Sequence, residues 1–83
     1  MPTILRVDDF AVRVLGPPRE HGPPHVHVTM GREGLVVVRL PLGSDPPLIW
    51  RTYHMKSRDV LRAYRIVEAN VVLLLDAWER IHG

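Results

Sequence analysis

The sequence of 83 residues contains no cysteine, and its longest unbroken apolar run extends only from Val71 to Leu75. The lack of thiols excludes disulfide bonds and thiolate metal sites, and it suits a reducing compartment. The apolar run is far shorter than the roughly 20 residues that a membrane-spanning helix needs. Residues Met1 to Arg6 also lack the apolar core and cleavage site of a signal peptide. We therefore expect a cytoplasmic protein that does not associate with a membrane.

The chain has the length of one domain, which we expect to span residues 1–83. Hydrophobic residues make up 46% of it and charged residues 24%, the balance of an ordinary globular protein. A domain of this size buries only about 60% of its unfolded surface. Its core is therefore small, and we expect a homo- or hetero-oligomer, such as a dimer, to add stability.

Alternation of apolar and polar residues predicts two β-hairpins. The first pairs Thr3 to Val7 with Phe10 to Leu15, and the second pairs His25 to Met30 with Leu35 to Leu40. Leu48 to Tyr53 is rich in β-forming residues and is a candidate fifth strand at the edge of the sheet.

From Ser57 onwards, apolar residues recur every three or four positions, which predicts a helix that reaches Ile81. Ser57 is the expected N-cap, and Asp59 suits the positive end of the helix dipole. Because such a helix would be on the order of 35 Å long, we expect a kink or break near Ala69-Asn70. Gly83 is expected to end it. The predicted apolar stripe consists of Val60, Tyr64, Val67, Val71, Leu74, Trp78 and Ile81.

The predicted fold class is α+β, with an antiparallel sheet of four to five strands packed against one long C-terminal helix.

Two histidines on a predicted strand are the clearest functional signal. Residues 16–24 hold four prolines and two glycines, which predicts a stiff surface loop leading to that strand. His25 and His27 then alternate with Val26 and Val28, so both imidazoles are expected on one face of the sheet while the valines face the core.

The histidine pair is a candidate catalytic site of a metal-independent ribonuclease. Imidazole changes charge near neutral pH, so His25 and His27 could move protons while the 2′-hydroxyl of RNA attacks the adjacent phosphate. Arg32, Arg39 or Arg51 could supply the positive charge that stabilises the phosphorane.

Two other roles for His25 and His27 stay open at this point. The rings could bind zinc or another transition metal, with His21, Glu20 or His54 as a third ligand. Alternatively, they are structural and cap the sheet with hydrogen bonds to the Pro-Pro loop.

Basic residues cluster after the predicted fifth strand. Between residues 51 and 65 only Asp59 is acidic. This excess indicates a nucleic-acid-binding surface or, alternatively, a solvated helix face. Trp50 and Tyr53 could stack on bases there or pack against the helix. The five basic residues are Arg51, Lys56, Arg58, Arg62 and Arg65.

Val72 and Leu73 point away from the predicted apolar stripe of the helix. Exposed aliphatic residues at this place indicate an interface with a partner protein, unless loops of the same chain cover them.

Three blocks of the sequence stand out, namely Met1 to Ile4, Pro23 to Val28 and a helical block that contains Ile66 to Glu68. In this order they resemble a small bacterial family called domain of unknown function 4160. The family is associated with gene pairs that look like toxin–antitoxin modules, and this implies a small cognate protein encoded nearby. The chain departs from the family pattern at Val71 to Leu73 and in the segment from Pro46 to Tyr53, where apolar surface is added. The matching residues are Met1 to Ile4, Arg6, Pro23 to Val28, Leu61, Ile66 to Glu68, Leu74, Leu75, Trp78 and Gly83.

The sequence thus predicts a toxin-like component of such a module that acts on RNA through His25 and His27. The alternatives are a non-catalytic partner-binding subunit (an antitoxin or adaptor) and a metal-binding protein. Whether the chain is an enzyme is left open.

Overall fold

The computed structural model describes residues 3–16 and 22–83. Most of the predicted stiff loop, together with the candidate ligands Glu20 and His21, lies outside the described residues. The predicted α+β fold is confirmed, with a five-stranded antiparallel sheet and a C-terminal helix that is split in two. The elements are β1 (Thr3–Val7), β2 (Phe10–Arg13), β3 (His25–Met30), β4 (Gly34–Arg39), β5 (Leu48–Tyr53), α1 (Ser57–Ala69) and α2 (Val71–His82).

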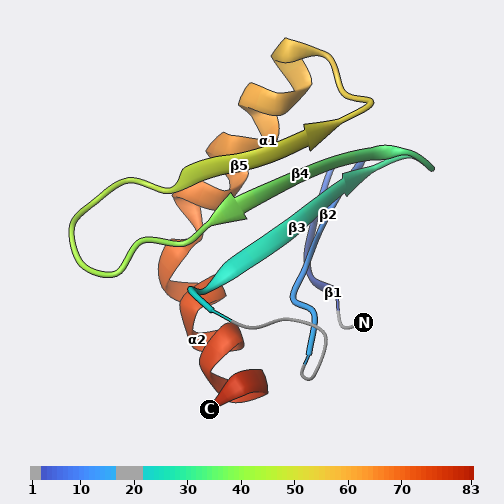
Figure 1. The fold of residues 1–83 in the computed structure, drawn as a ribbon. Helices are drawn as coiled ribbons and strands as arrows, with labels where there is room; N and C mark the ends of the chain where they lie inside the picture. Colours follow the sequence, from blue (N-terminus) through green and yellow to red (C-terminus); the bar gives the residue numbers. More distant parts are fainter. Residues whose placement is uncertain (1–2, 17–21) are drawn as a thin grey trace.

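The sheet is a meander in which every strand pairs with the next one along the chain (Figure 1). The predicted fifth strand is present and forms one edge of the sheet. The residue pairs Val12–Val28 and Val28–Val36 fix the register of the three central strands. Irregularities interrupt the pairing between Val37 and Val38 of β4 and between Thr3 and Leu5 of β1.

One face of the sheet forms the core with the two helices, which lie on the same side of it (Figure 1). Because side chains alternate along a strand, the residues that β2, β3 and β4 contribute to this core occupy every second position. The apolar stripe predicted for the helices supplies much of the other half of the core, with the exception of Val71, which is not among the core residues or those packed against them. The buried cluster consists of Phe10, Val12, Val14, Val26, Val28, Val36, Val38, Leu40, Ala63, Val67, Leu74 and Trp78.

The helix breaks at Asn70, as the sequence predicts. Asn70 has φ −126° and ψ 24°, and its side-chain amide donates a hydrogen bond to the carbonyl of Ile66 at 2.7 Å. The carbonyl of Asn70 in turn accepts from the amide of Leu74 at 2.9 Å, which starts α2. The side chain therefore satisfies a backbone carbonyl at the end of α1, a common way to terminate a helix.

The N-terminal end of α1 differs from the prediction. Lys56, with extended backbone angles, is the N-cap, and Ser57 is already the first helical residue. The amides of Asp59 and Val60 bond to the carbonyl of Lys56, each at 2.9 Å, so the backbone closes this turn without a side-chain cap. Ser57 as the N-cap was therefore wrong by one residue, whereas the predicted cap Gly83 at the other end is confirmed.

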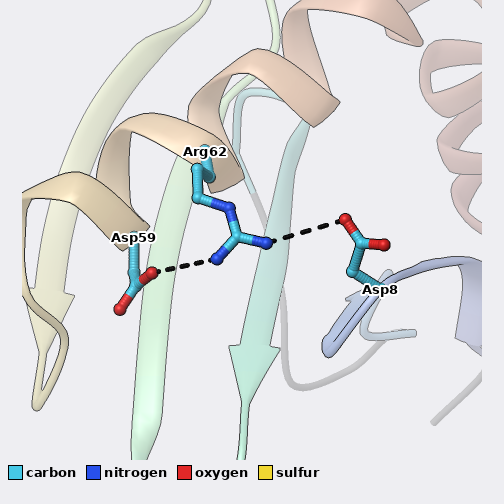
Figure 2. Close-up of polar contacts among 3 residues, drawn as sticks. All are labelled: Asp8, Asp59 and Arg62. Carbon is cyan, nitrogen blue, oxygen red and sulfur yellow. Dashed lines mark hydrogen bonds and ion pairs between the residues drawn. The ribbon is translucent and has the colours of Figure 1, made fainter.

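Arg62 joins α1 to the first hairpin on the helix side of the sheet (Figure 2). Its guanidinium lies 3.2 Å from a carboxylate oxygen of Asp59 and 3.6 Å from one of Asp8. The same group lies 5.0 Å from the centre of the Phe10 ring, within the range of a cation–π contact. Arg62 therefore covers the edge of the core and is partly neutralised there.

We expect Leu74→Ala to destabilise the fold strongly. Leu74 is fully buried in the cluster, and truncation of such a leucine costs about 2–5 kcal/mol through lost contacts and a residual cavity. The matched control is the neighbouring Leu73→Ala, which removes the same atoms from a side chain that is 43% exposed and should cost under about 1 kcal/mol. Urea unfolding followed by tryptophan fluorescence measures both. Equal losses would contradict the placement of α2.

Candidate functional site: the open face of the sheet

The face of the sheet opposite the helices carries both histidines. Cross-strand partners share a face, so the register identifies its members from strand to strand. Arg13 lies opposite His27, His27 opposite Val37, and Val37 opposite Arg51. We call this surface the open face. It consists of Thr3, Arg6, Ala11, Arg13, His25, His27, Thr29, Leu35, Val37, Arg39, Leu48, Arg51 and Tyr53.

Positive charge is concentrated on the open face. Arg6, Arg13, Arg39 and Arg51 come from four different strands, whereas none of the five strands contains an acidic residue. Arg6 and Arg51 are exposed, and Arg13 and Arg39 are half-buried. Because like charges cost free energy when they lie close together, this arrangement favours the binding of an anion or a polyanion.

Among the residues that the structure describes, Arg13 has an unsatisfied hydrogen-bond donor next to the histidine strand. Its Nε is buried and has no hydrogen-bond partner within the part of the chain that the structure describes. Leaving such a donor unpaired costs about 1–3 kcal/mol, more for a charged group. Arg13 is also the direct cross-strand neighbour of His27, so a phosphate oxygen that accepts from Arg13 would lie beside that imidazole.

The two imidazoles lie side by side but in different environments. Their ring centres are 5.7 Å apart, which confirms that they emerge together on one face of β3. His25 is only 4% exposed, whereas His27 is half-buried. A large substrate on the open face would therefore reach His27 first, with His25 beneath the surface.

His25 is held by aromatic packing at the start of β3, beside α2 (Figure 1). Its ring centre lies 5.3 Å from that of Trp50 and 5.1 Å from that of Trp78. Nδ1 lies 2.9 Å from the carbonyl oxygen of Pro23, and because a carbonyl only accepts, Nδ1 carries the proton. The expected hydrogen bond to the Pro-Pro segment is thus present for His25, which fixes the ring in the sheet.

The aromatic contacts continue into the C-terminal turn. The ring of His82 stacks on Trp78 at 3.7 Å, and its Nε2 donates to the carbonyl of Leu15 at 2.7 Å. These contacts tie the end of α2 to the segment that follows β2, on the far side of Trp78 from His25 in the chain of ring contacts. No sequence pattern indicated this role for His82, because the contact joins residues 67 positions apart.

The five basic residues predicted to bind nucleic acid do not form one surface. Arg51 lies on the open face, but Arg58, Arg62 and Arg65 belong to α1, which covers the opposite face. Lys56 is the exposed N-cap of that helix. Arg6, Arg13 and Arg39 instead join Arg51 at the site. The alternation of residues along each strand could have indicated these three arginines, because each lies on the face of its strand that the core residues do not occupy.

The predicted partner interface on α2, formed by Val72 and Leu73, is exposed. Val72 is 82% exposed and Leu73 43% exposed, so both are accessible to a partner. Among residues 3–16 and 22–83, no three histidine, aspartate or glutamate side chains gather closely enough to hold a metal ion. Neither described helix is long and apolar enough to cross a membrane.

Comparison with known families matches residues 16–79 to the family described as Domain of unknown function (DUF4160). The chain belongs to this family. The matched region contains the histidine strand β3, the arginine-bearing strands β4 and β5, and most of both helices. No curated protein and no solved structure gives a significant match.

We expect His25→Ala to destabilise the protein more than His25→Phe. Alanine removes the ring that packs against Trp50 and Trp78, at a cost of about 2–4 kcal/mol. Phenylalanine keeps a ring and loses the hydrogen bond to Pro23, about 1 kcal/mol. Urea unfolding measures the difference. Two variants of equal stability would show that the ring packing contributes nothing.

Proposed function

We propose that this DUF4160 protein binds single-stranded RNA on the open face of its sheet, and that the toxin-like activity expected from the sequence acts through that face. The supporting observation is the convergence of Arg6, Arg13, Arg39 and Arg51 around the histidine strand, with no acid in any strand. An exposed β-sheet face with basic and aromatic residues is a common surface for single-stranded RNA.

The strand spacing suits a nucleotide chain. Neighbouring strands are about 4.8 Å apart, so arginines on four strands can follow a backbone that crosses the sheet. Tyr53 and Trp50 of β5 are 44% and 41% exposed and offer ring faces to the bases at the end of that path. Because Arg13 and Arg39 are already half-buried, we expect them to lose less side-chain entropy on binding than fully exposed arginines.

The finer proposal is that His27 takes part in cleavage of the bound RNA. His27 would accept the proton of a 2′-hydroxyl, and that oxygen would attack the adjacent phosphorus. The bond from phosphorus to the 5′-oxygen then breaks, and the leaving oxygen takes a proton from solvent water. The products are a 2′,3′-cyclic phosphate and a 5′-hydroxyl. Arg13, opposite His27, and Arg51, on the same cross-strand row, would stabilise the charge that develops on the phosphate oxygens.

The binding proposal predicts different effects for arginines on the two faces of the molecule. Arg39→Ala with Arg51→Ala removes two charges from the open face and should weaken RNA binding roughly tenfold or more. Arg58→Ala with Arg65→Ala removes the same charge from α1 and should change affinity little. Fluorescence anisotropy with a labelled single-stranded RNA measures both Kd values.

The salt dependence provides an independent readout of the same contacts. Four arginine–phosphate contacts give a slope of log K against log salt of roughly −3, and the open-face double variant should halve it. If the α1 variant loses as much affinity and slope as the open-face variant, then binding is a general effect of net charge and the proposal fails.

The cleavage proposal predicts that the wild-type protein cuts RNA in the presence of EDTA and that His27→Ala does not. The expected product carries a 2′,3′-cyclic phosphate, detected by mass spectrometry. A DNA strand of the same sequence, which lacks the attacking hydroxyl, should bind and stay intact. Intact RNA with wild-type protein, together with normal growth of bacteria that express it alone, would remove the cleavage step and leave the binding proposal to its own test.

A further inference from the structure

The edge strand β5 has an outer edge that the RNA-binding proposal, which uses only side chains of this strand, does not account for. All six of its residues are exposed, on both faces of the strand. Four of them are large and apolar or aromatic, namely Leu48, Ile49, Trp50 and Tyr53. Such a strand presents a row of backbone groups without a neighbouring strand, together with apolar side chains, and this combination favours pairing with another chain.

Other elements leave β5 uncovered. The main helix–sheet contact of α1 is with β4, so the helix lies over the sheet inward of its edge. The opposite edge of the sheet differs, because the apolar residues Ile4, Leu5 and Val7 of β1 are partly buried. Single edge strands are usually protected by lysine, glutamate or proline. Within β5 the only charged residue is Arg51, and no proline is present.

We propose that β5 pairs in antiparallel orientation with β5 of a second copy of this chain. The two five-stranded sheets then form one continuous sheet with a two-fold axis between the β5 strands. A second copy is favoured over an unrelated strand because β5 is complementary to itself in one particular register.

That register follows from the irregularity in β5. Val37 pairs with Arg51 and Val38 with Ile49, so Trp50 is an inserted residue. The insertion places Leu48, Arg51 and Tyr53 on the open face and Ile49 and Thr52 on the helix face.

A two-fold axis between Trp50 and Arg51 brings together residues that share a face. Leu48 then lies opposite Tyr53 of the second copy, and Ile49 opposite Thr52. Trp50 lies opposite Arg51, and its indole can accept a cation–π contact from the guanidinium. A shift by one residue would place Arg51 opposite Arg51 and pair Ile49 with Tyr53 on the wrong face, since the side-chain period of a strand is two.

The dimer would place the open faces of both copies side by side on the same surface. The arginines of the two sheets would then form one longer basic surface, without a change in either fold. This consequence extends the surface proposed for RNA, but the dimer itself rests on β5 alone and can be measured without RNA.

The test uses two substitutions at one position that differ in charge. In the dimer, Trp50→Lys places a lysine opposite Arg51 at both symmetry-related positions. Because like charges repel, this variant should dimerise roughly tenfold or more weakly than Trp50→Glu. Trp50→Glu places a carboxylate opposite Arg51 twice and should retain the dimer. Both variants lose the same contact with His25, so a folding defect would affect them alike. Val72→Lys, on the exposed side of α2, is the control and should leave the dimer unchanged.

Light scattering on a size-exclusion column, over a range of protein concentrations, gives the mass of each full-length variant. The expected result is twice the 9.5 kDa of the monomer for the wild type, Trp50→Glu and Val72→Lys, and a shift towards the monomer for Trp50→Lys. A wild-type monomer at every concentration would overturn the proposal. A dimer lost in Val72→Lys but kept in Trp50→Lys would overturn it too, because the interface would then lie on α2.

Discussion

The burial of the valine face of the central strands beneath α1 and α2 is the constraint on which the rest of the structure depends. Val26 and Val28 of β3 are fully buried against residues of both helices. Because side chains alternate along a strand, this burial forces His25, His27 and Thr29 onto the opposite face. A shift of one residue would put the imidazoles into the core and the valines into water. The position of the site is therefore a consequence of how the core is packed.

The same constraint gathers positive charge. Arg13 of β2 and Arg39 of β4 lie on the face of the sheet that does not form the core. Antiparallel pairing places them opposite His27 and His25 of β3. Their charge is not offset within the sheet, since the acids of the described chain lie in turns, loops and helices. By contrast, Arg62 is engaged by Asp8 and Asp59 on the helix side. Arg62 on α1 and Arg51 on the sheet thus have different surroundings, although both belong to the basic stretch between residues 51 and 65.

The histidine pair illustrates how far a pattern predicts chemistry. Alternation correctly placed both rings on one face, and the hydrogen bond from His25 to Pro23 agrees with the structural role that the sequence left open. The difference in exposure between His25 and His27 could not be predicted from their spacing. It arises from Trp50, an inserted residue of β5, and from Trp78 of α2, both distant in sequence.

The sequence by itself determined the elements, because hydrophobic period and local backbone preference act within a few residues. It located β3 and β5, the apolar stripe of the helices and the break at Asn70, and it missed the cap of α1 by one residue. Only the tertiary structure decided which basic residues share a surface, which imidazole is accessible and which edge of the sheet is bare. Those properties depend on contacts between strands and helices far apart in the chain. Periodicity indicates on which side of its own strand a residue lies, but not which strands and helices become its neighbours.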